Sequence, residues 1–305
     1  MRYVAGIDGG GTKTTLICAD LNFKEILKKT YGAFNINSIG QEAFEQLLDE
    51  IIKDLNALGE CLELCIGAAG CSNAVMAETV KRKFKEADIS YSLVGDHIIA
   101  LEGAHDGKAG FAIIAGTGAI CFGKGEDGTI VRAGGWGHLI GDEGSAYGLA
   151  RDMIKAVAAY IDGYGQETVL TRLLSEKVGL TTSSQIIQFV YSGDKAKLAS
   201  ISYLVDEACK ERDVVALKVV EENAYAQARD LASVAKKLSL EDGYVAFFGG
   251  LIDKPTPFRE ELIKQIKKLT PKIKVRASLN TAAWGAVALA MKQYNKRCAS
   301  SVYIV

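Results

Sequence analysis

In the first hundred residues the apolar positions follow two different spacings, one typical of strands and one typical of helices. Tyr3–Asp8 and Thr14–Ala19 are short apolar or β-branched runs that predict two buried strands, and Phe23–Lys29 is expected to add a third. Ala43–Leu58 instead has the i, i+3 and i+4 spacing of an amphipathic helix. The pattern then predicts strand, helix, strand and helix in turn, at Leu62–Gly67, Ala74–Ala87, Ser90–Val94 and Ile98–His105. This order indicates a mixed sheet with helices on its faces.

The same opening recurs in the second half of the chain. Gly110–Ala115 and Ala119–Gly123 are expected to be strands, with another at Thr129–Arg132. Aligning Val4–Thr14 with Phe111–Cys121 superimposes two glycine-rich strand–turn–strand units that lie 107 residues apart. Such a period is too long for a solenoid repeat and indicates a duplicated domain.

The second copy is interrupted by a helical insertion at about residues 144–239. After it we expect a strand, a helix, a strand and a long C-terminal helix, at Tyr244–Phe248, Phe258–Leu269, Ile273–Ala277 and Thr281 to about Ala299. The expected domains are therefore residues 1–110 and 111–289, with the last helical residues, 290–305, packing back on the first domain.

Composition narrows the class of protein. The 36 Lys and Arg residues against 37 Asp and Glu residues leave a net charge of −1, which gives no electrostatic footprint for nucleic acid or an anionic membrane. The uncharged stretch Ala109–Gly123 is too short to span a bilayer. No signal peptide opens the chain, and the seven cysteines form no CxxC pair. We expect a cytoplasmic protein with reduced, structural thiols.

The glycine runs after the first strand of each repeat admit three interpretations. A Walker A loop requires its Lys after the second glycine at the start of a helix, but here Lys13 precedes a strand-like segment. A dinucleotide fingerprint must also open a helix, and neither run does. A hairpin whose glycine turn exposes consecutive N–H groups would cradle phosphate. Plain tight turns are the alternative, but two runs at equivalent places, each with a Thr, favour one polyphosphate held by both domains.

A carboxylate beside such phosphates needs a bridging cation. Asp8 ends the first strand, directly before the glycine turn. A bare carboxylate there would repel phosphate, so its position predicts Mg²⁺, held most simply through water. Together with the glycine turns, this predicts a Mg²⁺–nucleotide phosphotransferase or ATPase.

Three motifs carry a family resemblance. Gly6–Thr14 looks like the first phosphate motif of the actin/Hsp70/sugar-kinase superfamily, Ala115–Gly118 like the second, and Gly249-Gly250 like the adenosine motif. Within that superfamily the chain resembles the BadF/BadG/BcrA/BcrD-type ATPases and N-acetylglucosamine kinases. The resemblance implies an α/β protein of two tandem actin-like (ribonuclease H-like) domains, each a mixed five-stranded sheet with helices on both faces, with an ATP cleft between them. It implies that Asp8 holds Mg²⁺ and that ATP is bound by Gly9, Gly10, Gly11, Thr12, Lys13, Gly116, Thr117, Gly249 and Gly250.

Two further stretches resemble the amino-sugar kinases. Gly134–Gly148 looks like their sugar-binding segment, and Asn35–Gly40 looks like their N-domain sugar loop. The resemblance implies an acceptor site lined by Asn35, Asp96, Thr117, Gly118, Gly135, Trp136, Gly137 and Asp142. Structural alternatives exist for three of them: Trp136 could be a core residue, Asp142 could belong to the acidic first turn of a helix, and Asn35 could simply hold a turn.

Asp96 is the candidate general base. It follows the strand Ser90–Val94 and precedes Gly116 by 20 residues, which matches the family position of the catalytic Asp. A hydroxyl acceptor is helped by a base that takes its proton as the new P–O bond forms. The alternative is that Asp96 caps the following helix. The three histidines are dispersed, and none is expected to be catalytic.

These observations predict an ATP- and Mg²⁺-dependent kinase that phosphorylates the 6-hydroxyl of N-acetylglucosamine, N-acetylmuramic acid or both, as in cell-wall amino-sugar salvage. A glucosamine kinase is an alternative, and no stretch identifies the interface of a homodimer. An activator ATPase of the same family would need an iron–sulfur cluster, for which Cys61 and Cys65 are a poor match. A sugar-sensing repressor would carry an N-terminal DNA-binding domain before Gly6.

Overall fold

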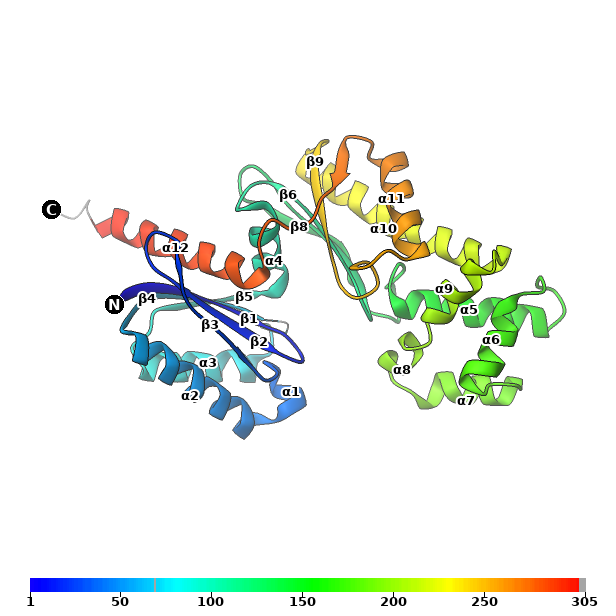
Figure 1. Cartoon of the computed structure of the whole chain (residues 1–305), viewed down its shortest axis with the longest axis horizontal. Helices are drawn as coiled ribbons and strands as arrows, with labels where there is room; N and C mark the ends of the chain where they lie inside the picture. Colours follow the sequence, from blue (N-terminus) through cyan, green and yellow to red (C-terminus); the bar gives the residue numbers. More distant parts are fainter. Residues whose placement is uncertain (69, 302–305) are drawn as a thin grey trace. The chain divides into compact units, whose positions relative to one another are not determined.

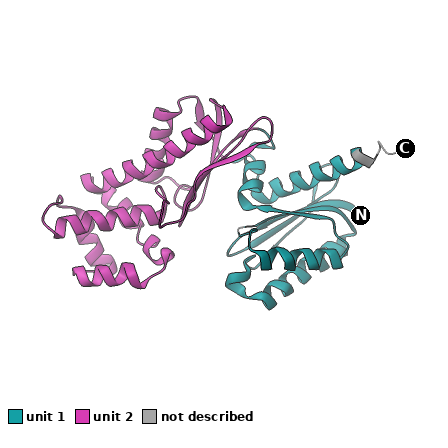
Figure 2. Ribbon diagram, turned by 180° about the vertical axis from the view of Figure 1, so that it is seen from behind, with its two compact units in different colours: residues 1–108, 278–305 teal, residues 109–277 magenta. Residues whose placement is uncertain are grey.

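The computed structural model describes residues 1–68 and 70–301, which form two compact units (Figures 1 and 2). The first unit combines residues 1–108 with the C-terminal segment from residue 278, and the second is residues 109–277. Each unit contains one five-stranded sheet.

The two sheets share one topology. The first has the order β3-β2-β1-β4-β5 and the second the order β10-β9-β6-β7-β8, so β6–β10 take the places of β1, β2, β3, β4 and β5. In each sheet the first three strands are antiparallel and the last two join in parallel. The strands are β1 (Arg2–Gly9), β2 (Thr14–Ala19), β3 (Glu25–Tyr31), β4 (Glu60–Ala68), β5 (Tyr91–Gly95), β6 (Gly110–Ala115), β7 (Ala119–Lys124), β8 (Ile130–Gly134), β9 (Gly243–Phe248) and β10 (Ile273–Val275). The predicted duplication and the two mixed five-stranded sheets are confirmed.

Helices cover both faces of the first sheet, because side chains alternate between the faces along a strand. Tyr3, Ala5 and Ile7 of β1 enter the core with α2 (Gln41–Leu58) and α3 (Ala74–Glu86), whereas Val4 faces α12. The remaining helices of this unit are α1 (Ile36–Ile39), α4 (Asp96–His105) and α12 (Ala282–Ser301).

The expected position of the last domain boundary was wrong. Residues 278–289 belong to the first unit together with the rest of the C-terminal segment, not to the second. The reason is that the apolar first half of α12, with Ala283, Ala286 and Val287, completes the core against β1 and β4. A Cβ on Gly6 of β1 would lie 2.4 Å from the backbone nitrogen of Val287, so the strand and the helix pack backbone to backbone.

The second unit is mainly helical outside its sheet. Its core joins β6 and β9 to the long helix α10 and to the helices of the insertion. The helices of this unit are α5 (Ala146–Ile161), α6 (Val169–Val178), α7 (Ser183–Ser192), α8 (Lys195–Ala199), α9 (Tyr203–Lys210) and α10 (Val214–Leu238), and α11 (Pro257–Leu269) after the insertion. Among the described residues, no helix of either unit is both long and apolar enough to cross a membrane.

The start of the third strand differs from the prediction. Phe23 lies in a turn with φ 61° rather than in β3. The Asp20 carboxylate accepts hydrogen bonds from the N–H groups of Asn22 and Lys24, both at 2.9 Å. This local bonding competes with the strand ladder and delays the strand to Glu25.

Candidate functional site

The first glycine turn leaves backbone donors open. Gly10 donates its N–H to the Lys13 carbonyl at 3.0 Å, which closes the hairpin between β1 and β2. The N–H groups of Gly11 and Thr12 make no hydrogen bond within the described part of the chain, and both residues are exposed. Open N–H groups at a glycine turn form a ready anion site.

The second unit repeats this arrangement between β6 and β7. Gly116 donates its N–H to the Gly118 carbonyl at 2.9 Å, and the N–H groups of Thr117 and Gly118 have no partner among the described residues. Gly249, which follows β9, has φ +102°, and a Cβ there would lie 2.4 Å from the Ala115 carbonyl oxygen. Only glycine fits this backbone, which brings the Gly249-Gly250 turn against the end of β6, beside Gly116. A Cβ on Gly250 would meet nothing within 4 Å, so that position is open.

Two carboxylates share one edge of the first sheet. Asp8 pairs with Gly67 of β4, and Gly67 pairs with Val94 of β5, so the carboxyl ends of three parallel strands meet there. Asp96 follows two residues after Val94. Burial and the neighbouring Asp96 carboxylate raise the pKa of Asp8, while Lys13 acts in the opposite direction.

Asp96 has the opposite pKa shift. His97 is the main cause: its Nδ1 lies 3.7 Å from Asp96 Oδ1, and its backbone N–H donates to the same oxygen at 2.9 Å. Together these interactions hold the pKa of Asp96 below its ordinary value despite partial burial. The carboxylate is 48% exposed, so it is both ionised and accessible. The helix-cap alternative was wrong, because Gly95 occupies the N-cap and Asp96 is the first residue of α4.

Asn35 lies beside the first glycine turn. The preceding residue, Phe34, donates its N–H to the Gly10 carbonyl at 2.9 Å. Asn35 Oδ1 accepts the N–H of Asn37 at 3.0 Å and so caps the short helix α1. The side chain therefore does hold a turn, and it does so next to the loop that the sequence predicted to bind phosphate.

The predicted sugar segment of the second unit presents an open aromatic ring. Trp136 is 66% exposed, which excludes a core role. The Arg132 guanidinium lies over its ring at 5.0 Å, and the flanking Gly135 and Gly137 both have positive φ. Gly135 donates its N–H to the Ala119 carbonyl, which ties this loop to the start of β7.

Asp142, in the same segment, is buried. It precedes α5, whose N-cap is Ser145, so the alternative that Asp142 belongs to the acidic first turn of this helix was wrong. Its Oδ1 accepts the N–H of Ala119 at 3.2 Å, and its Oδ2 accepts Nζ of Lys195 at 2.6 Å. Lys195 was missed by the sequence analysis, because it begins α8 and lies 53 residues further along the chain, with no local motif to mark it.

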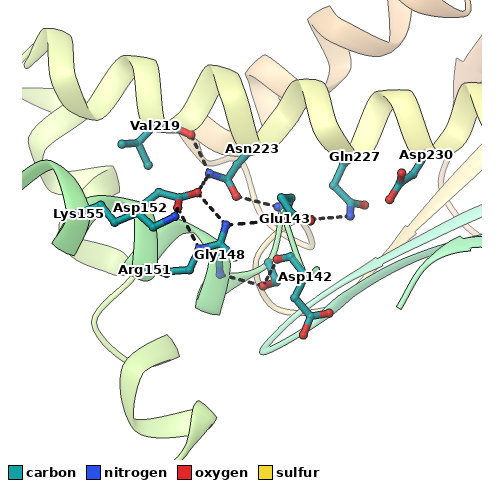
Figure 3. Close-up of polar contacts among 12 residues, drawn as sticks. Asp142, Glu143, Gly148, Arg151, Asp152, Lys155, Val219, Asn223, Gln227 and Asp230 are labelled. Carbon is teal, nitrogen blue, oxygen red and sulfur yellow. Dashed lines mark hydrogen bonds and ion pairs between the residues drawn. The ribbon is translucent and has the colours of Figure 1, made fainter. Parts of the chain in front are cut away.

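A polar network on α10 fixes the loop after Asp142 (Figure 3). Asn223 accepts the N–H of Gly144 at 2.8 Å, and Gln227 donates to the Glu143 carbonyl at 3.0 Å. Asn223 also donates to Asp152 at 3.0 Å. Both α10 side chains are about 1% exposed, so the loop is anchored from the interior of the unit. A cavity of about 670 Å³ opens beside this network, and none of the predicted site residues lines it.

The thiols give no sign of a metal centre. The described residues contain no group of three or more His, Cys, Asp or Glu side chains that could hold a metal ion. Burial raises the pKa of Cys61 to about 12 and that of Cys65 to about 11, which disfavours the thiolate that a cluster ligand must be.

The structure therefore groups the predicted residues by unit. Gly9–Lys13, Asp8, Asn35 and Asp96 lie together in the first, and the second holds Gly116–Gly118, Gly135–Gly137, Asp142 and Gly249-Gly250. This grouping follows from the fold and from the hydrogen bonds of the loops. That these residues bind the acceptor sugar and the nucleotide stays a prediction.

Comparison with known proteins gives consistent matches over almost the whole chain. Residues 5–290 match the model of the BadF/BadG/BcrA/BcrD ATPase family. An N-acetylmuramic acid/N-acetylglucosamine kinase of Clostridium acetobutylicum is 32% identical, over 96% of this chain and 99% of that protein. An N-acetyl-D-glucosamine kinase of Dictyostelium discoideum is 31% identical, over 94% and 97%. The crystal structure of a ROK hexokinase from Thermus thermophilus shares the fold, with a TM-score of 0.63 at 18% identity over 96% of this chain and 99% of that one.

Proposed function

Because the chain belongs to the BadF/BadG/BcrA/BcrD ATPase family, we propose that it is an ATP-dependent kinase of N-acetylated amino sugars. The observation that carries the proposal is the pair of glycine turns, at equivalent places in two sheets of one topology, each with open N–H groups. The named activities of the Clostridium and Dictyostelium relatives support the acceptor class.

The nucleotide is proposed to bind through backbone groups. The open N–H groups of the two turns, at residues 11–12 and 117–118, would donate to the phosphate oxygens, with the side chains of Lys13 and Thr117 as further donors. The turn at Gly249-Gly250 would receive the nucleoside at Gly250, where a Cβ would meet nothing within 4 Å.

Asp8 fits a role beside Mg²⁺. Its carboxylate is partly buried and faces a second carboxylate, which raises its pKa. A divalent cation near it would offset that crowding of negative charge, and oxygen is the ligand that Mg²⁺ prefers. When bound, the ion would supply charge neutralisation for the phosphate groups.

Asp96 is proposed as the general base. Its ionised carboxylate would take the proton of the acceptor 6-hydroxyl while the oxygen of that hydroxyl bonds to the γ-phosphorus and the bond to ADP breaks. The proton then passes from Asp96 to solvent. Asn35 in the first unit, and Thr117, Gly118, Gly135, Trp136, Gly137 and Asp142 in the second, are proposed to bind the sugar.

The test is an ATP-consumption assay with and without Mg²⁺. We expect Mg²⁺-dependent turnover with N-acetylglucosamine, N-acetylmuramic acid or both, ahead of glucosamine and glucose. Asp96→Asn is expected to fold and bind sugar but to lose about 10²–10⁴ in kcat, the usual cost of removing a general base. Near-normal turnover of this variant would place the base elsewhere, and glucose as the best acceptor would contradict the acetamido-sugar assignment.

A further inference from the structure

A cation lies among the residues proposed to bind the acceptor. Lys195 Nζ is 2.6 Å from Asp142 Oδ2. A Cβ placed on Gly118 would lie 2.7 Å from the same nitrogen, so the ammonium rests against the second glycine turn. Lys195, which belongs to the helical insertion, therefore contacts both the proposed acceptor-binding segment at Asp142 and the glycine turn at Gly118 within the second unit.

Burial separates the roles of the two partners. The Asp142 side chain is 3% exposed, whereas that of Lys195 is 28% exposed. Both carboxylate oxygens of Asp142 already have a donor, from Ala119 and from Lys195. A molecule that arrives at Gly118 therefore meets the ammonium before it meets the carboxylate.

The ammonium has donors to spare. A lysine carries three N–H donors, and Asp142 is the one hydrogen-bond partner of Lys195 among the described residues. Its ion pair with a buried carboxylate fixes its direction and removes much of the entropy cost of binding. Its two remaining N–H donors, held in a fixed position, could therefore donate hydrogen bonds to the hydroxyl or carbonyl oxygens of a sugar.

We propose that Lys195 binds the acceptor directly, beside Asp142, whose carboxylate also holds Lys195 in place. This rests on the proposed amino-sugar kinase function and adds a residue that the sequence did not reveal. Because a charge-assisted hydrogen bond is lost, Lys195→Met should weaken sugar binding about 10- to 100-fold. The KM for ATP should change by less than about threefold.

The experiment is a double-mutant cycle. Calorimetric titration with N-acetylglucosamine, without ATP, gives the Kd for the wild type, Lys195→Met, Asp142→Asn and the double variant. Asp142→Asn removes the buried charge that Lys195→Met alone would leave unpaired, which protects the double variant from a folding defect. Lys197→Met, which removes an exposed cation from the same helix, is the matched control, and thermal unfolding checks all five proteins.

The outcomes are distinct. Loss of affinity on adding Lys195→Met to the Asp142→Asn background, with Lys197→Met unaffected, supports direct contact. If Lys195→Met costs nothing in that background, Lys195 acts only through Asp142 and the proposal is wrong. Tight sugar binding without ATP turnover in the wild type would contradict the kinase function while leaving the role of Lys195 intact.

Discussion

Asp8 and Asp96 are two carboxylates at one edge of the first sheet, and we propose different roles for them. Asp8 is the next-to-last residue of β1 and Asp96 directly follows β5, yet the pKa of Asp8 is raised and that of Asp96 is lowered. The causes differ: burial, followed by the nearby Asp96 carboxylate, raises the pKa of Asp8, whereas hydrogen bonding to His97 is the main cause of the lowered pKa of Asp96. A cation bound near Asp8 would favour its ionised form and so oppose the raised pKa, whereas the lowered pKa of Asp96 keeps that carboxylate ionised at neutral pH, as a base must be.

This predicts a specific pH dependence. The base must be deprotonated, so kcat/KM should fall as the pH drops through the pKa of Asp96, which lies below its ordinary value. His97→Leu removes the main cause of that lowering, while burial and Asp8 remain. The pKa of Asp96 should then rise, and the acid limb of the kcat/KM profile should move to higher pH. In profiles from pH 4 to 9 the wild type should therefore show little of the acid limb, whereas His97→Leu should bring it into this range. Identical profiles for the two proteins would show that His97 does not control the base.

The sequence located Asp96 because its position is local: a strand end followed by a helix. Lys195 could not be found in this way, since its pairing with Asp142 joins segments 53 residues apart and depends on how the insertion folds. The glycine turns lie between these cases. Their residues were visible in the sequence, but the open donors at Gly11 and Thr117 follow from which N–H groups the hairpin itself consumes.

At the scale of elements, glycines set how closely α12 approaches its neighbours. A Cβ on Gly285 of α12 would lie 2.0 Å from the Ile99 carbonyl oxygen of α4, and one on Gly103 of α4 would lie 2.3 Å from the Thr281 carbonyl oxygen. On the strand side, Gly6 faces the backbone of Ala283 and Val287. Backbone atoms cannot rotate away as side chains do, so these contacts fix the position of α12 against β1 and α4.

Gly6→Ala should therefore destabilise the first unit. The added methyl group would meet backbone nitrogen and oxygen atoms of α12 at 2.4 and 2.6 Å. Overpacking of this kind costs about 1–3 kcal/mol, which lowers Tm by several degrees. Gly32→Ala is the control, because a Cβ there meets nothing within 4 Å. Equal Tm values for the two variants, measured by calorimetry, would contradict the close packing.

The duplication and most element bounds could be predicted from the sequence, because each domain begins with the same glycine-rich strand–turn–strand unit. The order of the strands in each sheet was not predicted and comes from the structure. The destination of α12 was only half predicted. Its Ala-rich sequence, which begins at Ala282, identified a buried helix. Nothing in the local sequence, however, indicates which of the two sheets this helix covers. The structure gives the whole helix to the first unit, since Gly6 offers a site for close backbone approach. That choice depends on contacts almost 280 residues apart in sequence.

At the scale of the molecule, the two units differ in how the chain builds them. Residues 109–277 form the second unit as one continuous segment with its own core. The first unit needs two segments, because five side chains of α12 complete the core over β1 and β4: Ala283, Ala286, Val287, Ala290 and Met291. Without them an apolar face of the sheet would be exposed to water. The free-energy cost of this exposure is roughly 25 cal/mol for each Å² of apolar surface.

The isolated units should therefore behave differently. Residues 109–277 alone should show one cooperative thermal transition, because every segment of that core is present. Residues 1–108 alone should aggregate or melt without cooperativity. Joining residues 278–301 to residues 1–108 through a Gly/Ser linker should restore a cooperative transition, measured by circular dichroism. In the linked protein Gly6→Ala should lower Tm as in the full chain. If residues 1–108 alone melted as the linked protein does, α12 would be peripheral to the core, and the close contact at Gly6 would have no structural role.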